Sequence, residues 1–110
     1  MPAGEDTRLD PAAFDELREL GGDDFVADLV ATFLADAPPL LAALRDSEVD
    51  EVRRAAHTLK SNGTTFGATR LSALCRELEE QAKAGDLAAA PTLADRIDEE
   101  YALVAAELRR

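Results

Sequence analysis

The chain has one histidine, His57, within the segment Ala56-His57-Thr58-Leu59-Lys60-Ser61-Asn62-Gly63. At about 100° per residue, a helix through this segment places its apolar residues on one side and His57 on the other, facing water. The apolar side comprises Val52, Ala55, Ala56, Leu59 and Phe66, and the helical neighbours of His57 are Arg53, Arg54, Lys60, Ser61 and Thr64. An exposed imidazole ringed by cations and hydroxyls is a poor core residue and is well placed to hold a phosphoryl group.

Histidine side chains are mostly neutral near pH 7, and a neutral imidazole is a nucleophile. Most exposed histidines are nevertheless ordinary solvated residues, so position alone favours no chemistry at His57. The residues that follow it in the sequence carry the stronger argument.

Other kinds of site have little support in the sequence. One histidine and one cysteine cannot build a zinc site, so we expect no metal, and the chain lacks the glycine-rich loop of a nucleotide site. Ser61 lies near His57 without a third residue to orient the pair. Cys75 falls on an apolar helical stripe, which predicts a small core residue.

The composition bounds the function further. A chain of 110 residues predicts one domain, and its net charge of −11 argues against binding nucleic acid or anionic lipid. A single cysteine favours a reducing compartment, and we expect a cytoplasmic protein because no uninterrupted apolar stretch approaches the roughly 18 residues of a membrane span.

Helical spacing dominates the first half of the chain. Residues 1–9 have no apolar periodicity and are expected to be flexible. Asp10-Pro11 is a typical helix start, and Gly21-Gly22 should end that short helix. A longer helix should follow from Asp23 to about residue 45, with a kink at Pro38-Pro39.

Three more helices are predicted in the second half. The first is capped within residues 47–50 (Ser47 to Asp50), runs to about Thr65 and is terminated by Gly67. The next is capped by Thr69 and ends at Gly85, and the last is entered through Asp86 and Pro91 and reaches Leu108. No segment alternates with period two. Residues 10–110 are therefore predicted to form an all-α, antiparallel up-down-up-down four-helix bundle with a short extra N-terminal helix.

The segment Ala56-His57-Thr58-Leu59-Lys60, continuing to Phe66-Gly67-Ala68, resembles the signature of the histidine-containing phosphotransfer (HPt) domain. The layout is also similar, including Phe33-Leu34-Ala35-Asp36-Ala37 and the helix with Leu71, Leu74, Cys75 and Glu77-Leu78-Glu79. The resemblance implies that His57 accepts a phosphoryl group from a receiver-domain aspartate and passes it to another receiver. Such a carrier has no turnover of its own and needs no cofactor, because the receiver supplies the aspartate and Mg²⁺.

The resemblance also implies roles for residues near His57. Lys60 would lie beside the phosphoryl oxygens. Ser61 stands where the family commonly has glycine, and its hydroxyl would bond either a phosphoryl oxygen or the carbonyl of His57. Glu79 would accept a hydrogen bond from Nδ1 of His57 and leave Nε2 free for the transfer.

Partners would be receiver domains of response regulators or hybrid histidine kinases, docking around His57 on the helices of residues 23–45 and 47–65. Arg53 and Arg54 would meet the acidic pocket of a receiver, or else pair only with Glu48 or Asp50. Thr64 is a further candidate for docking. We expect a monomer that forms transient complexes.

Two other functions fit the same sequence. One is an acidic helical adaptor that binds a partner without phosphotransfer, in which case His57 would be dispensable. The other is a phosphatase or inhibitor of a receiver, in which His57 promotes loss of phosphate.

Overall fold

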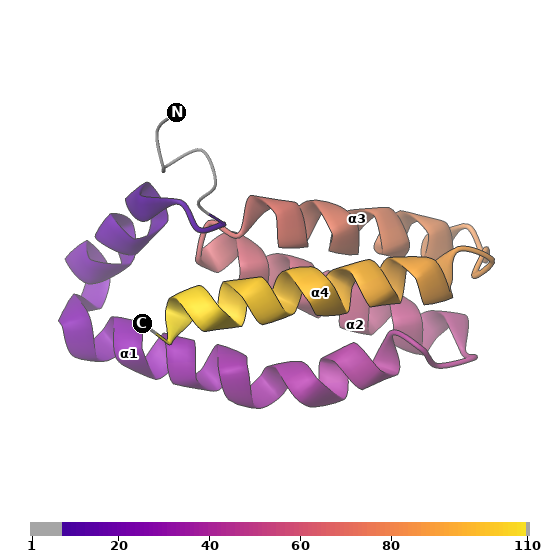
Figure 1. Ribbon diagram of the computed structural model, residues 1–110, viewed down its shortest axis with the longest axis horizontal. Helices are drawn as coiled ribbons and strands as arrows, with labels where there is room; N and C mark the ends of the chain where they lie inside the picture. The colour runs from indigo at the N-terminus through magenta and orange to yellow at the C-terminus, as the bar shows by residue number, and fades with distance from the viewer. Residues whose placement is uncertain (1–7, 110) are drawn as a thin grey trace.

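The computed structural model describes residues 8–109, which form four α-helices and, within that range, no strand. The helices are α1 (Pro11–Ala43), α2 (Val49–Thr65), α3 (Thr69–Lys83) and α4 (Ala90–Leu108). Successive helices run in opposite directions (Figure 1). Contacts join α1 to α2, α2 to α3, α3 to α4 and α4 back to α1, so the helices form a ring in chain order. The predicted all-α, up-down-up-down bundle is confirmed.

The predicted short N-terminal helix is the first part of α1. Asp10 caps it, with its carboxylate accepting from the backbone N–H of Ala12 at 3.0 Å. Gly22 then departs from helical geometry (φ 82°, ψ −177°), and the chain turns there into the longer part of α1 (Figure 1). A positive φ of this size suits glycine, which has no Cβ. The predicted boundary at Gly21-Gly22 is therefore where the helix changes direction.

The kink expected at Pro38-Pro39 is not seen in the backbone angles. Both prolines lie inside α1, and Gly22 is the residue of that helix with non-helical angles. The fixed φ of proline is compatible with a helix, so the lost N–H donors did not interrupt it here. The change of direction in α1 lies at the glycine instead.

The first part of α1, residues 11–21, covers one end of the bundle. Its Phe14 ring lies 5.7 Å from Phe66, and Phe66 lies 5.4 Å from Phe33, measured between ring centroids. The N–H of Asp10 also donates to the carbonyl of Gly67 at 3.1 Å, which ties the start of α1 to the turn between α2 and α3. Leu9 packs against the core as well. The prediction of flexibility for residues 1–7 lies outside the described residues.

One predicted helix cap is wrong. The N-cap of α2 is Glu48, within the predicted residues 47–50, whereas that of α3 is Ala68 in place of Thr69. Neither residue makes a side-chain capping bond. Thr69 is instead the first residue of α3, because α2 ends at Thr65 and the turn made by Phe66, Gly67 (φ 69°) and Ala68 leads directly into the next helix. The predicted ends at Gly67 and Gly85 are confirmed, since both glycines have positive φ.

The core lies along the axis of the bundle and contains one stripe from each helix. The predicted apolar side of α2 is buried throughout, with Val52, Ala56 and Leu59 at 0% exposure. Cys75 is also fully buried, as its position on the stripe of α3 predicted. Burial of these stripes is the main force that holds the helices together, at about 25 cal/mol per Å² of apolar area.

One helix, α1, is long and apolar enough to cross a membrane by length and composition alone, with a mean hydropathy of 1.5 over 18 residues. The prediction concerned uninterrupted apolar stretches, and α1 contains none of that length because Asp28 and Asp36 divide its apolar residues. Val26 and Phe33 of the same helix are buried against the bundle. Length and composition are weak support for a membrane span in a helix that packs in this way.

Candidate functional site

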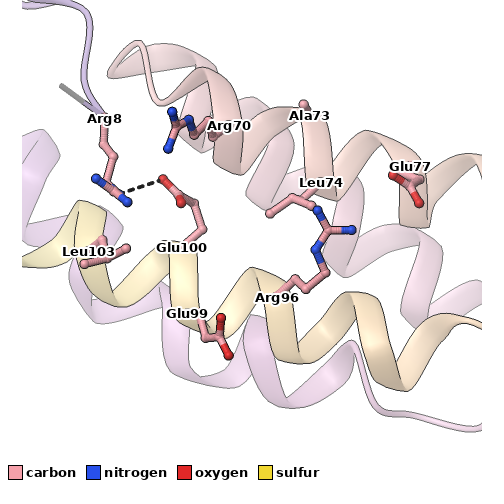
Figure 2. A pocket seen from close by; sticks show the side chains of 9 residues that line it. All are labelled: Arg8, Arg70, Ala73, Leu74, Glu77, Arg96, Glu99, Glu100 and Leu103. Carbon is pink, nitrogen blue, oxygen red and sulfur yellow. Dashed lines mark ion pairs between the residues drawn. The ribbon is translucent and has the colours of Figure 1, made fainter. Parts of the chain in front are cut away.

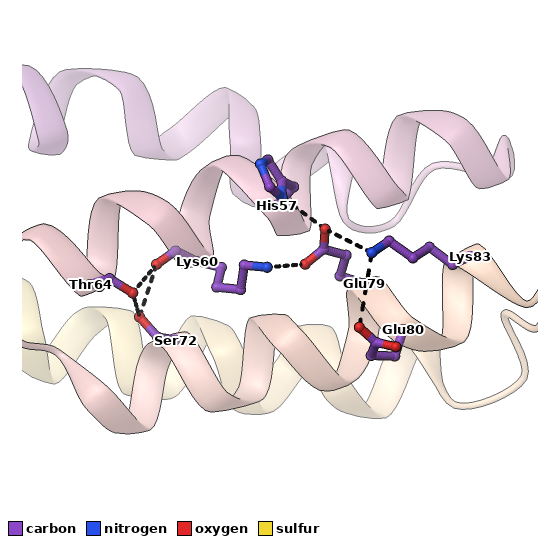
Figure 3. A network of polar contacts seen from close by, with 7 residues as sticks. All are labelled: His57, Lys60, Thr64, Ser72, Glu79, Glu80 and Lys83. Atoms are coloured by element: carbon purple, nitrogen blue, oxygen red, sulfur yellow. Dashed lines mark hydrogen bonds and ion pairs between the residues drawn. The ribbon is translucent and has the colours of Figure 1, made fainter.

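His57 lies in the middle of α2 and points out of the bundle, with 57% of its side chain exposed. Its Nδ1 atom is 2.8 Å from Oε2 of Glu79 on α3 (Figure 3). The predicted exposure of His57 and its proximity to Glu79 are both present in the structure. Nε2, the other ring nitrogen, makes no hydrogen bond to another described residue.

Glu79 joins the charged groups of this site. Only 2% of the residue is exposed, and a buried carboxylate must have partners to be stable. Its Oε1 accepts from Nζ of Lys60 at 2.5 Å, and its Oε2 lies 3.8 Å from Nζ of Lys83 as well as near His57. One carboxylate therefore serves an imidazole and two ammonium groups.

These partners keep Glu79 ionised. Burial alone would raise the pKa of its carboxyl group, but the hydrogen bonds and charges of Lys60 and His57 outweigh burial and hold that pKa below its usual range. An ionised carboxylate can only accept hydrogen bonds, so Nδ1 of His57 carries the ring proton in the neutral imidazole. The lone pair is then on Nε2.

The arrangement provides an exposed nitrogen nucleophile beside a cation. Lys60 lies one turn after His57, with 24% of its side chain exposed, and its flexible stem can bring the ammonium to an anion bound at the ring. Such a site can take up an electrophilic phosphoryl group at Nε2 and balance its charge. Within residues 8–109, no three His, Cys, Asp or Glu side chains gather as they would around a metal ion.

Ser61 and Thr64 differ in their surroundings. The Ser61 hydroxyl makes no hydrogen bond within the described residues, so the predicted bond to the carbonyl of His57 is not formed. The Thr64 hydroxyl lies 2.9 Å from the carbonyl of Lys60 and 3.1 Å from the hydroxyl of Ser72. Thr64 is still exposed, and a docking role for it stays a prediction.

The two arginines before His57 pair with acids of the preceding turn. Arg53 lies 3.8 Å from Asp50, which is one of its predicted partners. Arg54 lies 3.5 Å from Glu51, which the sequence reasoning did not name. Exposed pairs of this kind are weak, so both guanidinium groups are available to a partner.

Two residues of the site were missed in the sequence. Lys83 follows Glu79 by four residues on α3, and that spacing on a helix was a usable signal. Ser72 contacts α2 through its hydroxyl, and nothing in the sequence marks it out.

A groove lies on the other side of α3, against α4 (Figure 2). It has a volume of about 550 Å³. Its lining is Arg8, Arg70, Ala73, Leu74, Glu77, Arg96, Glu99, Glu100 and Leu103. Successive residues on a helix are about 100° apart, so Arg70 and Glu77 lie almost opposite Glu79 around α3. The groove is therefore separate from the site at His57.

Comparisons with known proteins point to one family. A family model described as "Hpt domain" matches residues 28–107. The chain is 33% identical over 87 residues to the sensor protein TorS of Escherichia coli (strain K12), which covers 74% of the chain but only 9% of TorS. The crystal structure of histidine-containing phosphotransfer protein B (HptB) from Pseudomonas aeruginosa PAO1 superposes with a TM-score of 0.86 at 30% identity, covering 94% of this chain and 93% of HptB.

Proposed function

This chain belongs to the Hpt domain family, and on that basis we propose that it is a phosphocarrier of a multistep His–Asp phosphorelay. His57 accepts a phosphoryl group from the aspartyl phosphate of one receiver domain and passes it to the aspartate of another. The observation that carries this proposal is the contact of 2.8 Å between Nδ1 of His57 and the buried carboxylate of Glu79. It leaves Nε2 unprotonated and exposed.

The transfer makes one bond and breaks one. The Nε2 lone pair of His57 attacks phosphorus, the Nε2–P bond forms, and the bond from phosphorus to the aspartyl oxygen breaks with its electron pair left on the aspartate. No base is needed, because Nε2 carries no proton. The ring becomes an imidazolium with Nδ1–H still directed at Glu79, whose negative charge stabilises it. Passing the group to the next receiver reverses these steps.

Lys60 supports the phosphoryl group in this scheme. In the structure its ammonium is bound to Glu79, within reach of the ring edge. The incoming group adds roughly −1.5 to −2 charges, which attract the ammonium away from Glu79. Mg²⁺ and the reacting aspartate belong to the receiver, so this chain needs no cofactor and turns over no substrate by itself.

Receivers dock across α1 and α2 around His57. A shallow groove between these helices is lined by Leu29, Thr32, Phe33, Asp36, Asn62, Thr65 and Phe66. Arg53 and Arg54 border His57 on the preceding turn and would meet the acids of a receiver. HptB and TorS bear the names of a phosphotransfer protein and a sensor protein, which supports response regulators or hybrid kinases as partners. The carrier acts as a monomer in the cytoplasm.

Incubation with a receiver that carries ³²P on its aspartate tests the proposal. Acid-labile, alkali-stable label should appear on this chain and should be absent from His57→Gln, which stays folded because the side chain is exposed. Release of free phosphate without label on the chain would indicate a phosphatase. Binding without any loss of phosphate from the receiver would indicate an adaptor.

A further inference from the structure

The seam between α2 and α3 has a second polar contact besides Glu79. The hydroxyl of Ser72 donates to the backbone carbonyl of Lys60 at 2.9 Å, and Ser72 is only 8% exposed (Figure 3). Glu79 contacts the side chains of α2, whereas Ser72 contacts its backbone. A bond to the backbone constrains the position of the helix itself.

Two hydroxyl protons are shared among three oxygen atoms at this contact. Ser72 uses its proton on the Lys60 carbonyl. Thr64 lies 2.9 Å from the same carbonyl and 3.1 Å from the Ser72 oxygen, so its proton can serve either acceptor. Each hydroxyl therefore has a partner, and the buried polar group of Ser72 is satisfied without water.

Lys60 is held at two points by α3. Its carbonyl is held by Ser72, and its ammonium is held by Glu79. Ser72 and Glu79 are seven residues apart, which is about two helical turns or 10.5 Å along the axis. Two contacts at that separation fix how far α3 can slide along α2, and this sliding position decides whether Glu79 reaches His57.

Gly63 makes room for this contact. A Cβ atom at Gly63 would lie 2.8 Å from Oγ of Ser72, which is closer than real Cβ contacts. Glycine inside a helix costs about 1 kcal/mol relative to alanine, and the close approach of the hydroxyl accounts for its presence here. The Ser72 hydroxyl is therefore the specific neighbour that favours glycine at position 63.

We propose that Ser72 is a positioning residue for His57, acting through Lys60 and Glu79. The inference rests on the proposed phosphocarrier function. Without the Ser72 hydroxyl, α3 keeps its apolar packing but loses its bond to the backbone of α2. Glu79 then spends less time at hydrogen-bond distance from Nδ1, and the ring proton moves in part to Nε2, where it blocks attack on phosphorus.

Ser72→Ala tests this inference with two measurements. The chain has one histidine, so ¹⁵N spectra report the two ring nitrogens of His57 without overlap. We expect the wild type to show the proton on Nδ1 and Ser72→Ala to shift the population toward Nε2–H. Phosphorylation of His57 by phosphoramidate, a small donor that needs no docking, should slow by about 3- to 10-fold.

Thr69→Val is the matched control. Thr69 carries a hydroxyl on α3 as Ser72 does, but the residue is exposed and its hydroxyl makes no hydrogen bond to another described residue. This variant should keep the wild-type ring signals and phosphorylation rate. Gly63→Ala is the second test, because it displaces the Ser72 hydroxyl while alanine favours the helix, and it should resemble Ser72→Ala.

The outcomes separate positioning from simple stability. If Ser72→Ala and Gly63→Ala are less stable but keep the wild-type ring signals and rate, Ser72 is only a packing residue and the inference is overturned. If Ser72→Ala does not fold, the ring signals and phosphorylation rate of Gly63→Ala decide whether Ser72 positions His57. If the wild type is never phosphorylated, the proposed function fails, while the ring signals still decide the role of Ser72.

Discussion

The two sides of α3 both carry many charges, but they use them differently. On the side facing α2, Glu79 is 2% exposed and is shared by His57, Lys60 and Lys83. On the side facing α4, six charged residues line the groove, and the ion pair described among them joins Arg8 to Glu100 at 3.3 Å. Arg70 and Arg96, on the same groove, make no hydrogen bond or ion pair within residues 8–109.

This comparison shows that the number of charges does not define a site. In the groove most of the charged groups are exposed to solvent, where each interaction is weak, and Glu100 at 8% exposure is the buried exception. Around Glu79 they converge on one buried carboxylate, which in this structure contacts both Nδ1 of His57 and the ammonium of Lys60. A reaction at His57 depends on that convergence, and substitutions on the two sides of α3 should separate the two cases.

The largest difference is expected between Glu79→Ala and Glu77→Ala. Loss of Glu79 frees the ring proton of His57 and the ammonium of Lys60 together, so transfer from a phosphorylated receiver should slow by about 10- to 100-fold. Glu77 is exposed on the other side of α3, and its loss should leave the rate unchanged. Initial rates of ³²P transfer measure both variants. Equal rates would remove Glu79 from the mechanism.

Lys60→Ala and Arg96→Ala compare one cation from each side of α3. Lys60 can reach the phosphoryl oxygens and balance the charge that develops there. Its removal should therefore slow transfer by about 10-fold. Arg96 carries the same charge but lies on the groove, and its removal should have no effect. A similar loss in both variants would indicate that only the total charge of the domain matters.

Acid should reduce the stability that the contacts of Glu79 between α2 and α3 contribute. The pKa of the Glu79 carboxyl is lower in the folded protein than in the unfolded chain, so its contribution to stability is present above about pH 4.3 and is lost as the pH falls through the lowered folded pKa. At pH 7 we expect Glu79→Gln to lower the free energy of unfolding by about 1–2 kcal/mol. The difference from wild type should shrink below about pH 4.

Urea unfolding of wild type and Glu79→Gln at several pH values measures this effect. Glu77→Gln, with the same change of charge on the groove side, is the control and should track the wild type within about 0.5 kcal/mol. A difference at pH 7 that persists unchanged at pH 3 would show that the carboxylate charge is not what stabilises the site.

The smallest expected effect is the chemical labelling of Cys75 in the native protein. Cys75 lies on α3 and is fully buried. Burial raises the pKa of its thiol to about 12, with the nearby charge of Glu79 adding to the shift. Because the thiolate is the reactive form, iodoacetamide at pH 8 should leave native Cys75 unmodified and should modify it after unfolding in urea. Rapid labelling of the native protein would mean that α3 separates from the bundle readily.

The sequence predicted the parts of the site that depend on a single helix. The exposure of His57 and the position of Lys60 one turn later follow from the spacing of apolar residues in α2. Glu79 was named only through the resemblance to the HPt family, because it comes 22 residues after His57 on another helix and the chain has many glutamates. Its burial depends on how α3 packs against α2, and no local pattern encodes that.

The errors in the fold also have local causes. Thr69 is a good capping residue, but the short turn after Gly67 makes Ala68 the N-cap. Pro38 and Pro39 usually disturb a helix, yet here their fixed φ fits the helical path of α1. In both cases the geometry of neighbouring elements outweighed the preference of the residue itself.

The short first part of α1 has a practical consequence for choosing where the domain begins. The family match starts at residue 28, well after Gly22. A fragment cut at that point would lack Phe14 and would open the aromatic end of the bundle at Phe66 and Phe33 to solvent. Exposed aromatic surface of this kind promotes self-association, so such a fragment should be poorly soluble even with every residue of the His57 site intact.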